Sequence, residues 1–383
     1  MIDDLLTRCT AATPRMLADI ERLVSCETPT NDLPAVVDGA GLVEEIGRGL
    51  LGVPAERIVL DGRTHLRWQL GGTDTGPRVL LVAHQDTVWP IGTLQRLPFR
   101  IDGEVLRGPG CFDMKTGVVM ALHAVGQLTG SGPAPAVTVL VTGDEEIGSP
   151  SSRALIEDEA RKSTAAFVLE ASADDGALKT GRKGVSLYQV SVTGRAAHAG
   201  LEPEKGINAA VEIAGQVLTI AALGDSAVGT SVVPATVSAG TTTNTVPATA
   251  TLSVDSRAWT RAEQDRVQVS IMALQPSVPG AGVRVTGGIN RPPMERVGSQ
   301  RLFALAVELA AQVGAGVLQQ VSVGGGSDGN FTAGVGCPTL DGLGAVGGGA
   351  HADTEHVIIA EIPRRTALLA ALIRAVCDGA PVR

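Results

Sequence analysis

Several apolar runs in this chain end at a residue that can bind a metal ion. VLLVAH ends at His84, VTVLVTGDEE at Glu145 and Glu146, and AAFVLE at Glu170. Continuous apolar runs of this length, separated by helix-length segments, predict buried parallel strands. Because open α/β sheets present their functional groups beyond the carboxyl ends of such strands, these side chains are expected to converge. A fourth apolar, glycine-rich stretch, PTLDGLGAVGGGAH, ends at His351.

The same pattern divides the chain into two predicted domains. Residues 1–178 and 292–383 alternate strand-like and helix-like segments, which predicts an α/β domain whose mostly parallel sheet is flanked by helices. Residues 179–291 instead carry short, alternating, Val/Thr-rich strands around the helix-like segment INAAVEIAGQVLTIAAL. We expect this middle block to be a small α+β domain inserted into the larger one.

Composition and charge narrow the range of partners. The chain has 383 residues, of which 44% are hydrophobic and 19% charged, as is typical of a globular protein with a large core. Its net charge is −9, and it contains no long Lys/Arg block. Neither nucleic acid nor an anionic membrane surface is therefore an expected partner.

Targeting signals and cysteine usage predict a cytoplasmic location. No stretch reaches the roughly 20 consecutive apolar residues of a membrane span, and the N-terminal segment carries acidic residues where a secretory signal carries positive charge. The five cysteines are scattered without a CxxC pair. This spacing argues against a disulfide framework and against a thiolate zinc site.

Asp86 follows His84 by two residues at a predicted strand end, so both side chains share a face. A carboxylate in that position can hydrogen-bond to the remote nitrogen of a metal-binding histidine and fix its tautomer. A strand-end histidine bonded to its neighbour, with no metal, explains this tripeptide equally well.

The other acidic residues also have two interpretations each. Glu145 and Glu146 are adjacent, so their side chains diverge, and one could bind a metal while the other moves protons. An acidic helix start is the simpler interpretation of the pair. Asp113 follows the rigid sequence GPGCF, where one carboxylate can bridge two cations, but an ordinary helix N-cap is its simpler role.

Nine short motifs occur together in an order that points to one enzyme family. They are HQD at 84–86, GPGCFDMKTG at 108–117, GDEEIGS at 143–149, LEAS at 169–172, GRAAHAG at 194–200, NTVP at 244–247, DSR at 255–257, GGGSDGN at 324–330 and AHADTEH at 350–356. The chain thereby resembles the co-catalytic di-zinc aminoacylase/carboxypeptidase family of acetylornithine deacetylase, succinyl-diaminopimelate desuccinylase and the glutamate carboxypeptidases. The match is closest to the glutamate carboxypeptidase branch, and it spans nearly the whole chain.

The resemblance implies a catalytic domain that holds two zinc ions. His84 and Glu170 would bind one ion, Glu146 and His351 the other, and Asp113 would bridge them. Imidazole and carboxylate ligands without thiolates suit zinc, with cobalt or manganese as substitutes.

The resemblance also assigns roles to residues around the ions. Glu145 would be the general base of the reaction, and Asp86 would orient His84. The peptide bond after Asp113 would be cis.

The remaining implied roles belong to the inserted domain. Arg257, with Asn244, would clamp the free α-carboxylate of the substrate; without the resemblance, a salt bridge with Asp255 explains Arg257. His198 would reach the active site of a second subunit and stabilise the oxyanion, whereas the sequence alone makes it a loop histidine. The inserted domain would then serve as both lid and dimer interface of a homodimer.

The predicted reaction is hydrolysis of an amide bond that releases a C-terminal amino acid from a small peptide or N-acyl amino acid. Glutamate as that amino acid rests on the branch resemblance alone. The alternatives are an N-acyl-amino-acid deacylase or a dipeptidase of the same family. A non-catalytic, metal-stabilised protein that binds amino-acid conjugates is less favoured, because every ligand position and Glu145 are present.

Overall fold

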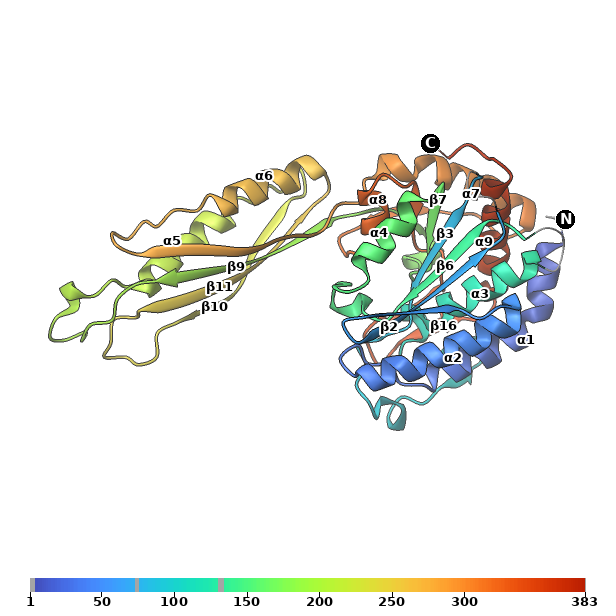
Figure 1. The fold of residues 1–383 in the computed structure, drawn as a ribbon, viewed down its shortest axis with the longest axis horizontal. Helices are drawn as coiled ribbons and strands as arrows, with labels where there is room; N and C mark the ends of the chain where they lie inside the picture. The colour runs from blue at the N-terminus through green and yellow to red at the C-terminus, as the bar shows by residue number, and fades with distance from the viewer. Residues whose placement is uncertain (1–3, 73–75, 130–133, 383) are drawn as a thin grey trace. The chain divides into compact units, whose positions relative to one another are not determined.

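The computed structural model of the protein describes residues 4–72, 76–129 and 134–382 (Figure 1). Contacts within the chain divide it into two compact units. Unit 1 comprises Met1–Gly181, Arg296–Val323 and Ser327–Arg383, and unit 2 comprises Arg182–Glu295 and Gly324–Gly326.

The main sheet of unit 1 has the strand order β1-β2-β6-β3-β7-β14. Its strands are β1 (Glu56–Leu60), β2 (Arg63–Leu70), β3 (Val79–His84), β6 (Val137–Thr142), β7 (Ala165–Val168) and β14 (Thr339–Leu340). β6, β3, β7 and β14 run parallel to one another, whereas β1 and β2 pair antiparallel. The predicted α/β class with a mostly parallel sheet is therefore confirmed.

Helices cover both faces of this sheet (Figure 1). They are α1 (Leu5–Val24), α2 (Leu33–Leu51), α3 (Thr116–Thr129), α4 (Arg153–Arg161), α7 (Gln300–Val313), α8 (Gly329–Gly334) and α9 (Glu361–Cys377). Leu81 of β3 belongs to the larger core on one face, and Leu80 packs in a second core with Phe331 of α8 on the other. Every residue of β3 and β6 is buried, and this burial on both faces is why their sequences are continuously apolar.

Short strands from the C-terminal part of unit 1 pair with short strands from earlier in the chain. They are β4 (Arg100–Asp102), β5 (Val105–Arg107), β8 (Leu178–Arg182), β13 (Gln320–Val323), β15 (Gly347–Gly348) and β16 (His356–Ile358). β13 pairs with β8, and the other four form a sheet in the order β15-β16-β5-β4. In that sheet His356 lies opposite Arg107, so the loop that precedes β16 lies next to the loop that follows β5.

Unit 2 is an antiparallel sheet in the order β10-β11-β9-β12 with two helices packed on it. Its elements are β9 (Gly184–Thr193), α5 (Ala209–Ala221), β10 (Ser231–Ala239), β11 (Thr249–Ala258), α6 (Arg261–Met272) and β12 (Gly282–Arg291). Alternate residues of β9 and β11, such as Val190 and Leu252, are buried in a core with Ile213 and Val267 of the helices. None of the described helices of either unit is long and apolar enough to cross a membrane.

Two features differ from the sequence-based expectation. α6 was missed because its inward face is narrow: the buried apolar residues Val267 and Ile271 lie one turn apart in an otherwise polar segment. The fourth apolar run contributes only Thr339–Leu340 to the main sheet. His351 therefore does not follow a long strand but lies in a loop between β15 and β16.

Candidate metal centre

Three neighbouring parallel strands bring polar side chains to one edge of the main sheet. His84 is the last residue of β3, Glu145 follows the end of β6, and Glu170 follows the end of β7. β3 lies between β6 and β7, so residues that are far apart in the sequence become neighbours. One ligand atom each of His84, Glu145 and Glu170 lies within 4.8 Å of the others.

Asp113 reaches this edge from a short irregular turn, Cys111–Lys115, that precedes α3. The backbone of Asp113 is non-helical (φ −119°, ψ 95°), and α3 begins only at Thr116, so Asp113 is not the N-cap of this helix. Gly110, at φ +73°, makes the turn possible because a residue with a Cβ rarely adopts this conformation. The peptide bond between Asp113 and Met114 is cis, as the resemblance implies.

The two oxygens of Asp113 face two different histidines. Oδ1 lies 3.4 Å from Nε2 of His84, and Oδ2 lies 3.3 Å from Nε2 of His351. Each histidine also faces a glutamate: His84 Nε2 is 3.7 Å from Glu170 Oε1, and His351 Nε2 is 3.3 Å from Glu146 Oε2. Asp113 thus lies between two groups, each of one imidazole and one further carboxylate.

His351 has a backbone conformation that is unusual for its residue type. Its φ is +60°, in the left-handed region that non-glycine residues rarely occupy, and its side chain is half exposed. Strained conformations of this kind are concentrated at functional sites, where the surrounding structure maintains them. His351 lies in the loop between β15 and β16, and its imidazole is directed to Asp113 and Glu146.

The donor set fits a divalent metal ion. Among the described residues, His84 Nε2, Asp113 Oδ1 and Glu146 Oε1 are buried atoms without a hydrogen-bond partner, although buried polar atoms nearly always have one. Ligand atoms of His84, Asp113 and Glu146 also lie within 4.8 Å of one another. Nitrogen and carboxylate oxygen ligands at this spacing suit zinc and related transition metals.

The carboxylates create a strong negative potential at this centre. Burial lowers the pKa of His84, but the nearby carboxylates of Asp113 and Asp86 outweigh burial and hold this pKa well above its usual value. Hydrogen bonds with Asp113 and Glu146 raise the pKa of His351 to about 10. Burial raises the pKa of Asp113, yet the two histidines lower it strongly overall. The field that favours positively charged imidazoles also favours a bound cation.

Asp86 is fully buried and holds the backbone beside the centre. Its carboxylate accepts hydrogen bonds from the backbone amides of Glu145 (3.3 Å) and Glu146 (3.2 Å) and from Oγ1 of Thr30 (2.7 Å). The nearer partner of His84 Nδ1 is the backbone carbonyl of Asp86, not its carboxylate. Asp86 therefore contacts three parts of the site, whereas the sequence had suggested only its histidine neighbour.

The predicted substrate-binding residues lie in unit 2. Arg257 donates from Nε and Nη2 to the two carboxylate oxygens of Asp255 (3.0 and 3.1 Å), and its Nη1 donates to the carbonyl of Gly324 (3.0 Å). The salt bridge that the sequence offered as an alternative is thus present. Because an arginine has five N–H groups, two donors of Arg257 are left by these bonds.

His198 and Asn244 belong to neighbouring loops of unit 2. Nδ1 of His198 accepts hydrogen bonds from the backbone amides of Gly200 (3.1 Å) and Leu201 (3.2 Å). Since a backbone N–H only donates, the ring proton of a neutral His198 must be on Nε2. The carbonyl of Asn244 accepts from the amide of Ala199 (2.9 Å), which ties the two loops together.

Sequence reasoning missed one buried acid at this centre, Glu355. It lies four residues after His351 in a polar segment, so it resembles an exposed loop acid, yet it is only 3% exposed. The signal that could have found it is the sequence GPGCFD itself. A turn this rich in glycine leaves several backbone N–H groups without partners in regular structure, and these groups need an acceptor when they are buried.

Comparison with known proteins supports a peptidase. The family described as Peptidase family M20/M25/M40 matches residues 80–375. Carboxypeptidase G2 of Pseudomonas sp. (strain RS-16) is 33% identical over 379 residues, which cover 96% of this chain and 91% of that protein.

Solved structures share the fold over nearly the whole chain. Aminopeptidase PepT from Bacillus cereus has a TM-score of 0.75 at 21% identity, covering 95% of this chain and 98% of that one. The M20 family metallo-carboxypeptidase Sso-CP2 from Sulfolobus solfataricus has a TM-score of 0.73 at 16% identity, covering 95% and 99%.

Proposed function

The chain belongs to peptidase family M20/M25/M40 and is a metallopeptidase, and from this premise we propose that it is a two-zinc carboxypeptidase that releases a C-terminal amino acid. The observation that carries the proposal is the position of Asp113, whose two oxygens face His84 and His351 separately. A carboxylate arranged in this way suits a bridge between two cations, and the similarity to carboxypeptidase G2 supports the carboxypeptidase class.

The proposed ligands divide into two sets that share Asp113. His84 and Glu170 would hold one zinc ion, and Glu146 and His351 the other. When bound, two such ions polarise the scissile carbonyl, lower the pKa of water and stabilise negative charge on the substrate oxygen. Three carboxylates against two divalent cations leave one net positive charge, which suits a site where an oxyanion develops.

Glu145 is proposed as the general base. It would accept a proton from the attacking water and return it to the nitrogen of the leaving amine. Its backbone is fixed by the bond from its amide to Asp86, and its carboxylate lies within 4.8 Å of ligand atoms of His84 and Glu170. A carboxylate held at that distance is close enough to reach a water at the same centre.

Residues of unit 2 would bind the substrate. Arg257 retains N–H groups that can hold the α-carboxylate of the substrate. Asn244 is proposed to bind the same carboxylate, as the resemblance implies. His198, whose ring proton is on Nε2, can donate a hydrogen bond to the oxyanion. Glutamate is the first candidate for the released amino acid, because the motifs are closest to the glutamate carboxypeptidase branch.

A homodimer is proposed from the surface of unit 2, in line with the resemblance. β10 is an edge strand, and it exposes Val233 and Val237. α5 exposes Val211 and Leu218, the latter to 74%. Exposed apolar side chains beside an unpaired strand edge are typical of an interface. The molar mass from light scattering should be that of a dimer, and Val237→Lys should reduce it, whereas Val269→Lys on α6 should not.

A cytoplasmic location is proposed as well. The five cysteines, all within the described residues, form no disulfide bonds with one another, as is usual in a reducing compartment. Cell fractionation with antibody detection tests this location, and recovery of the protein in an oxidising compartment would contradict it.

Metal analysis and a substrate panel test the catalytic proposal. We expect about two equivalents of zinc per chain, and hydrolysis of folyl-glutamate and of peptides with a free C-terminus. Hydrolysis of N-acyl amino acids alone would make the protein a deacylase, and hydrolysis of dipeptides alone a dipeptidase. A fully metal-loaded protein that binds these compounds without turnover would overturn the catalytic assignment.

A further inference from the structure

Glu355 accepts hydrogen bonds at both of its carboxylate oxygens. Oε1 accepts from the backbone amides of Phe112 (2.9 Å) and Asp113 (3.1 Å). Oε2 accepts from the backbone amide of Gly110 (2.9 Å) and from the indole Nε1 of Trp89 (2.9 Å). Three of the four donors therefore belong to the turn that carries Asp113.

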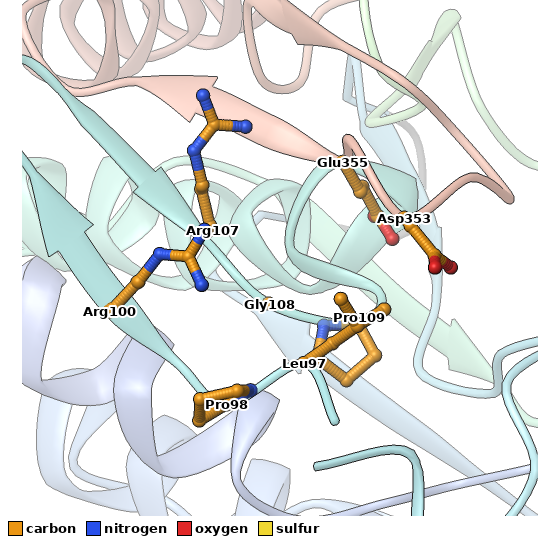
Figure 2. Close-up of a pocket in the computed structure, with 8 residues that line it drawn as sticks. All are labelled: Leu97, Pro98, Arg100, Arg107, Gly108, Pro109, Asp353 and Glu355. Carbon is orange, nitrogen blue, oxygen red and sulfur yellow. The ribbon is translucent and has the colours of Figure 1, made fainter. Parts of the chain in front are cut away.

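These bonds replace the partners that the turn lacks. Gly108 and Gly110 have positive φ values (150° and 73°), so the chain bends sharply and directs several amides to the same side. Buried amides without an acceptor cost about 1–3 kcal/mol each. Figure 2 shows the side chain of Glu355 directed to the Gly108–Pro109 turn, beside a small pocket that these residues line with Asp353.

The groups that donate hydrogen bonds to Glu355 are neutral. Within the described part of the chain, no arginine or lysine forms a salt bridge with it, although Arg100 and Arg107 line the same pocket (Figure 2). Its hydrogen bonds come only from neutral donors, and the buried ammonium group of Lys115 acts on it through longer-range electrostatic attraction and not through a direct contact. That arrangement suits a residue whose role is to fix a geometry.

The position of Glu355 in the chain links two proposed ligands. It lies four residues after His351, and the following residue, His356, pairs with Arg107 just before the Asp113 turn. Asp113 and His351 are thus held by segments that Glu355 joins directly. Loss of the hydrogen bonds between Glu355 and the Asp113 turn would alter the 3.3 Å separation between Asp113 Oδ2 and His351 Nε2.

We propose that Glu355 is a positioning residue of the metal centre, which fixes the Asp113 turn against the His351 loop and thereby sets the affinity for the metal ion. This inference rests on the proposed metal centre and adds to it a residue outside the ligand set. Residues that orient metal ligands typically change metal affinity by about 10–100-fold when they are replaced.

The test compares Zn²⁺ affinity in the full-length protein by competition with a chromophoric chelator. Glu355→Gln keeps the size of the side chain but replaces one acceptor oxygen with an NH₂ group, which cannot accept from two of the four donors. We expect Zn²⁺ affinity to fall by about 10–100-fold, the visible spectrum of the Co²⁺-loaded protein to change, and kcat to fall more than KM rises. Glu355→Asp, which keeps both oxygens but shortens the reach, should have an intermediate affinity.

Glu159→Gln is the matched control. Glu159 lies in α4 and is also buried, at 1% exposed, but it pairs with Arg67 of β2 and with Lys162. This variant should lose stability and keep the Zn²⁺ affinity and Co²⁺ spectrum of the unmodified protein.

Wild-type Zn²⁺ affinity and Co²⁺ spectrum in Glu355→Gln would overturn the proposal. If circular dichroism shows that Glu355→Gln does not fold, Glu355→Asp decides the question. Wild-type Zn²⁺ affinity and a wild-type Co²⁺ spectrum in Glu355→Asp would then overturn the proposal. A failure of the proposed function is distinct, because the unmodified protein would then bind no Zn²⁺ or would bind it without hydrolysing any substrate.

Discussion

Nδ1 of His84 lies 3.0 Å from the backbone carbonyl oxygen of Asp86 and 3.5 Å from the nearer oxygen of the Asp86 carboxylate. The ring proton on Nδ1 is thus directed to the carbonyl, and Nε2 is left to face Asp113. The carboxylate of Asp86 is then available for the backbone amides of Glu145 and Glu146. One residue therefore fixes the tautomer of one proposed ligand and the backbone of the proposed base.

We predict that Asp86→Ala lowers kcat by about 10–100-fold. It leaves two amides without their acceptor and removes the shorter bond of the Thr30 hydroxyl, which can still donate to the carbonyl of Thr87. The free energy of unfolding should therefore also fall, by about 1–3 kcal/mol for each amide. Steady-state kinetics and urea denaturation measure the two effects. Thr30→Val removes a single bond to the same carboxylate and should have a much smaller effect on kcat; equal effects of both variants would contradict this role of Asp86.

Glu145→Gln should strongly lower kcat while the metal content stays unchanged. The amide cannot accept a proton, and loss of a general base typically reduces kcat by about 10²–10⁴-fold. Kinetics combined with elemental analysis of the same sample measures both quantities. Glu146→Gln is the paired control, expected to lower the metal content. If Glu145→Gln also lost metal, Glu145 would be a ligand and not a base.

Removal of metal should destabilise the fold. A ligand that binds only the native state stabilises it by about 4 kcal/mol when its free concentration is about 1,000 times Kd. A chelator should therefore lower the midpoint of thermal unfolding by several degrees, and added Zn²⁺ should restore it. In His351→Ala the shift should be smaller, because one proposed ligand is lost. If the chelator left the midpoint of thermal unfolding unchanged, the result would argue against a metal centre.

Arg257→Lys should raise KM by about 10–100-fold with little change in kcat, since a lysine cannot form the paired hydrogen bonds of a guanidinium with a carboxylate. Initial rates over a range of substrate concentrations separate the two parameters. Arg284→Lys, at an exposed position on β12, is the control and should leave KM unchanged. If Arg257→Lys lowered stability but kept KM, the only role of Arg257 would be its salt bridge with Asp255.

His65 should make stability depend on pH in the acidic range. Burial lowers the pKa of His65 below its usual 6.5, although Asp144 and Asp86 partly oppose this shift. The unfolded chain therefore binds a proton as the pH falls below about 6.5, while the folded chain does not, so the free energy of unfolding decreases as pH falls. One such group contributes at most about 1.4 kcal/mol per pH unit.

Urea denaturation at several pH values tests the role of His65. The difference in stability between wild type and His65→Gln should change between pH 6.5 and pH 5, with the variant losing less stability on acidification. Ser151→Ala removes the partner of His65 Nε2 but keeps the histidine, so it should retain the wild-type slope. Parallel curves for wild type and His65→Gln would contradict the assignment.

The sequence by itself determined the α/β class and the identity of the strand ends. β3 and β6 are buried on both faces, and a strand in that environment must be apolar throughout. The polar residue that ends each run is therefore visible without a structure. The alternating strands of unit 2, such as β9 and β11, were equally predictable, because one of their faces is exposed.

Only the tertiary structure decided which of the residues at the strand ends become neighbours in space. β3 lies between β6 and β7 through pairings that no local pattern encodes, and His351 reaches Asp113 from a loop and not from a strand. Glu355 and the amide of Asp113 are 242 positions apart in the chain. Contacts over such separations depend on how whole elements pack, whereas hydrophobic periodicity reports only the environment of each residue within its own element.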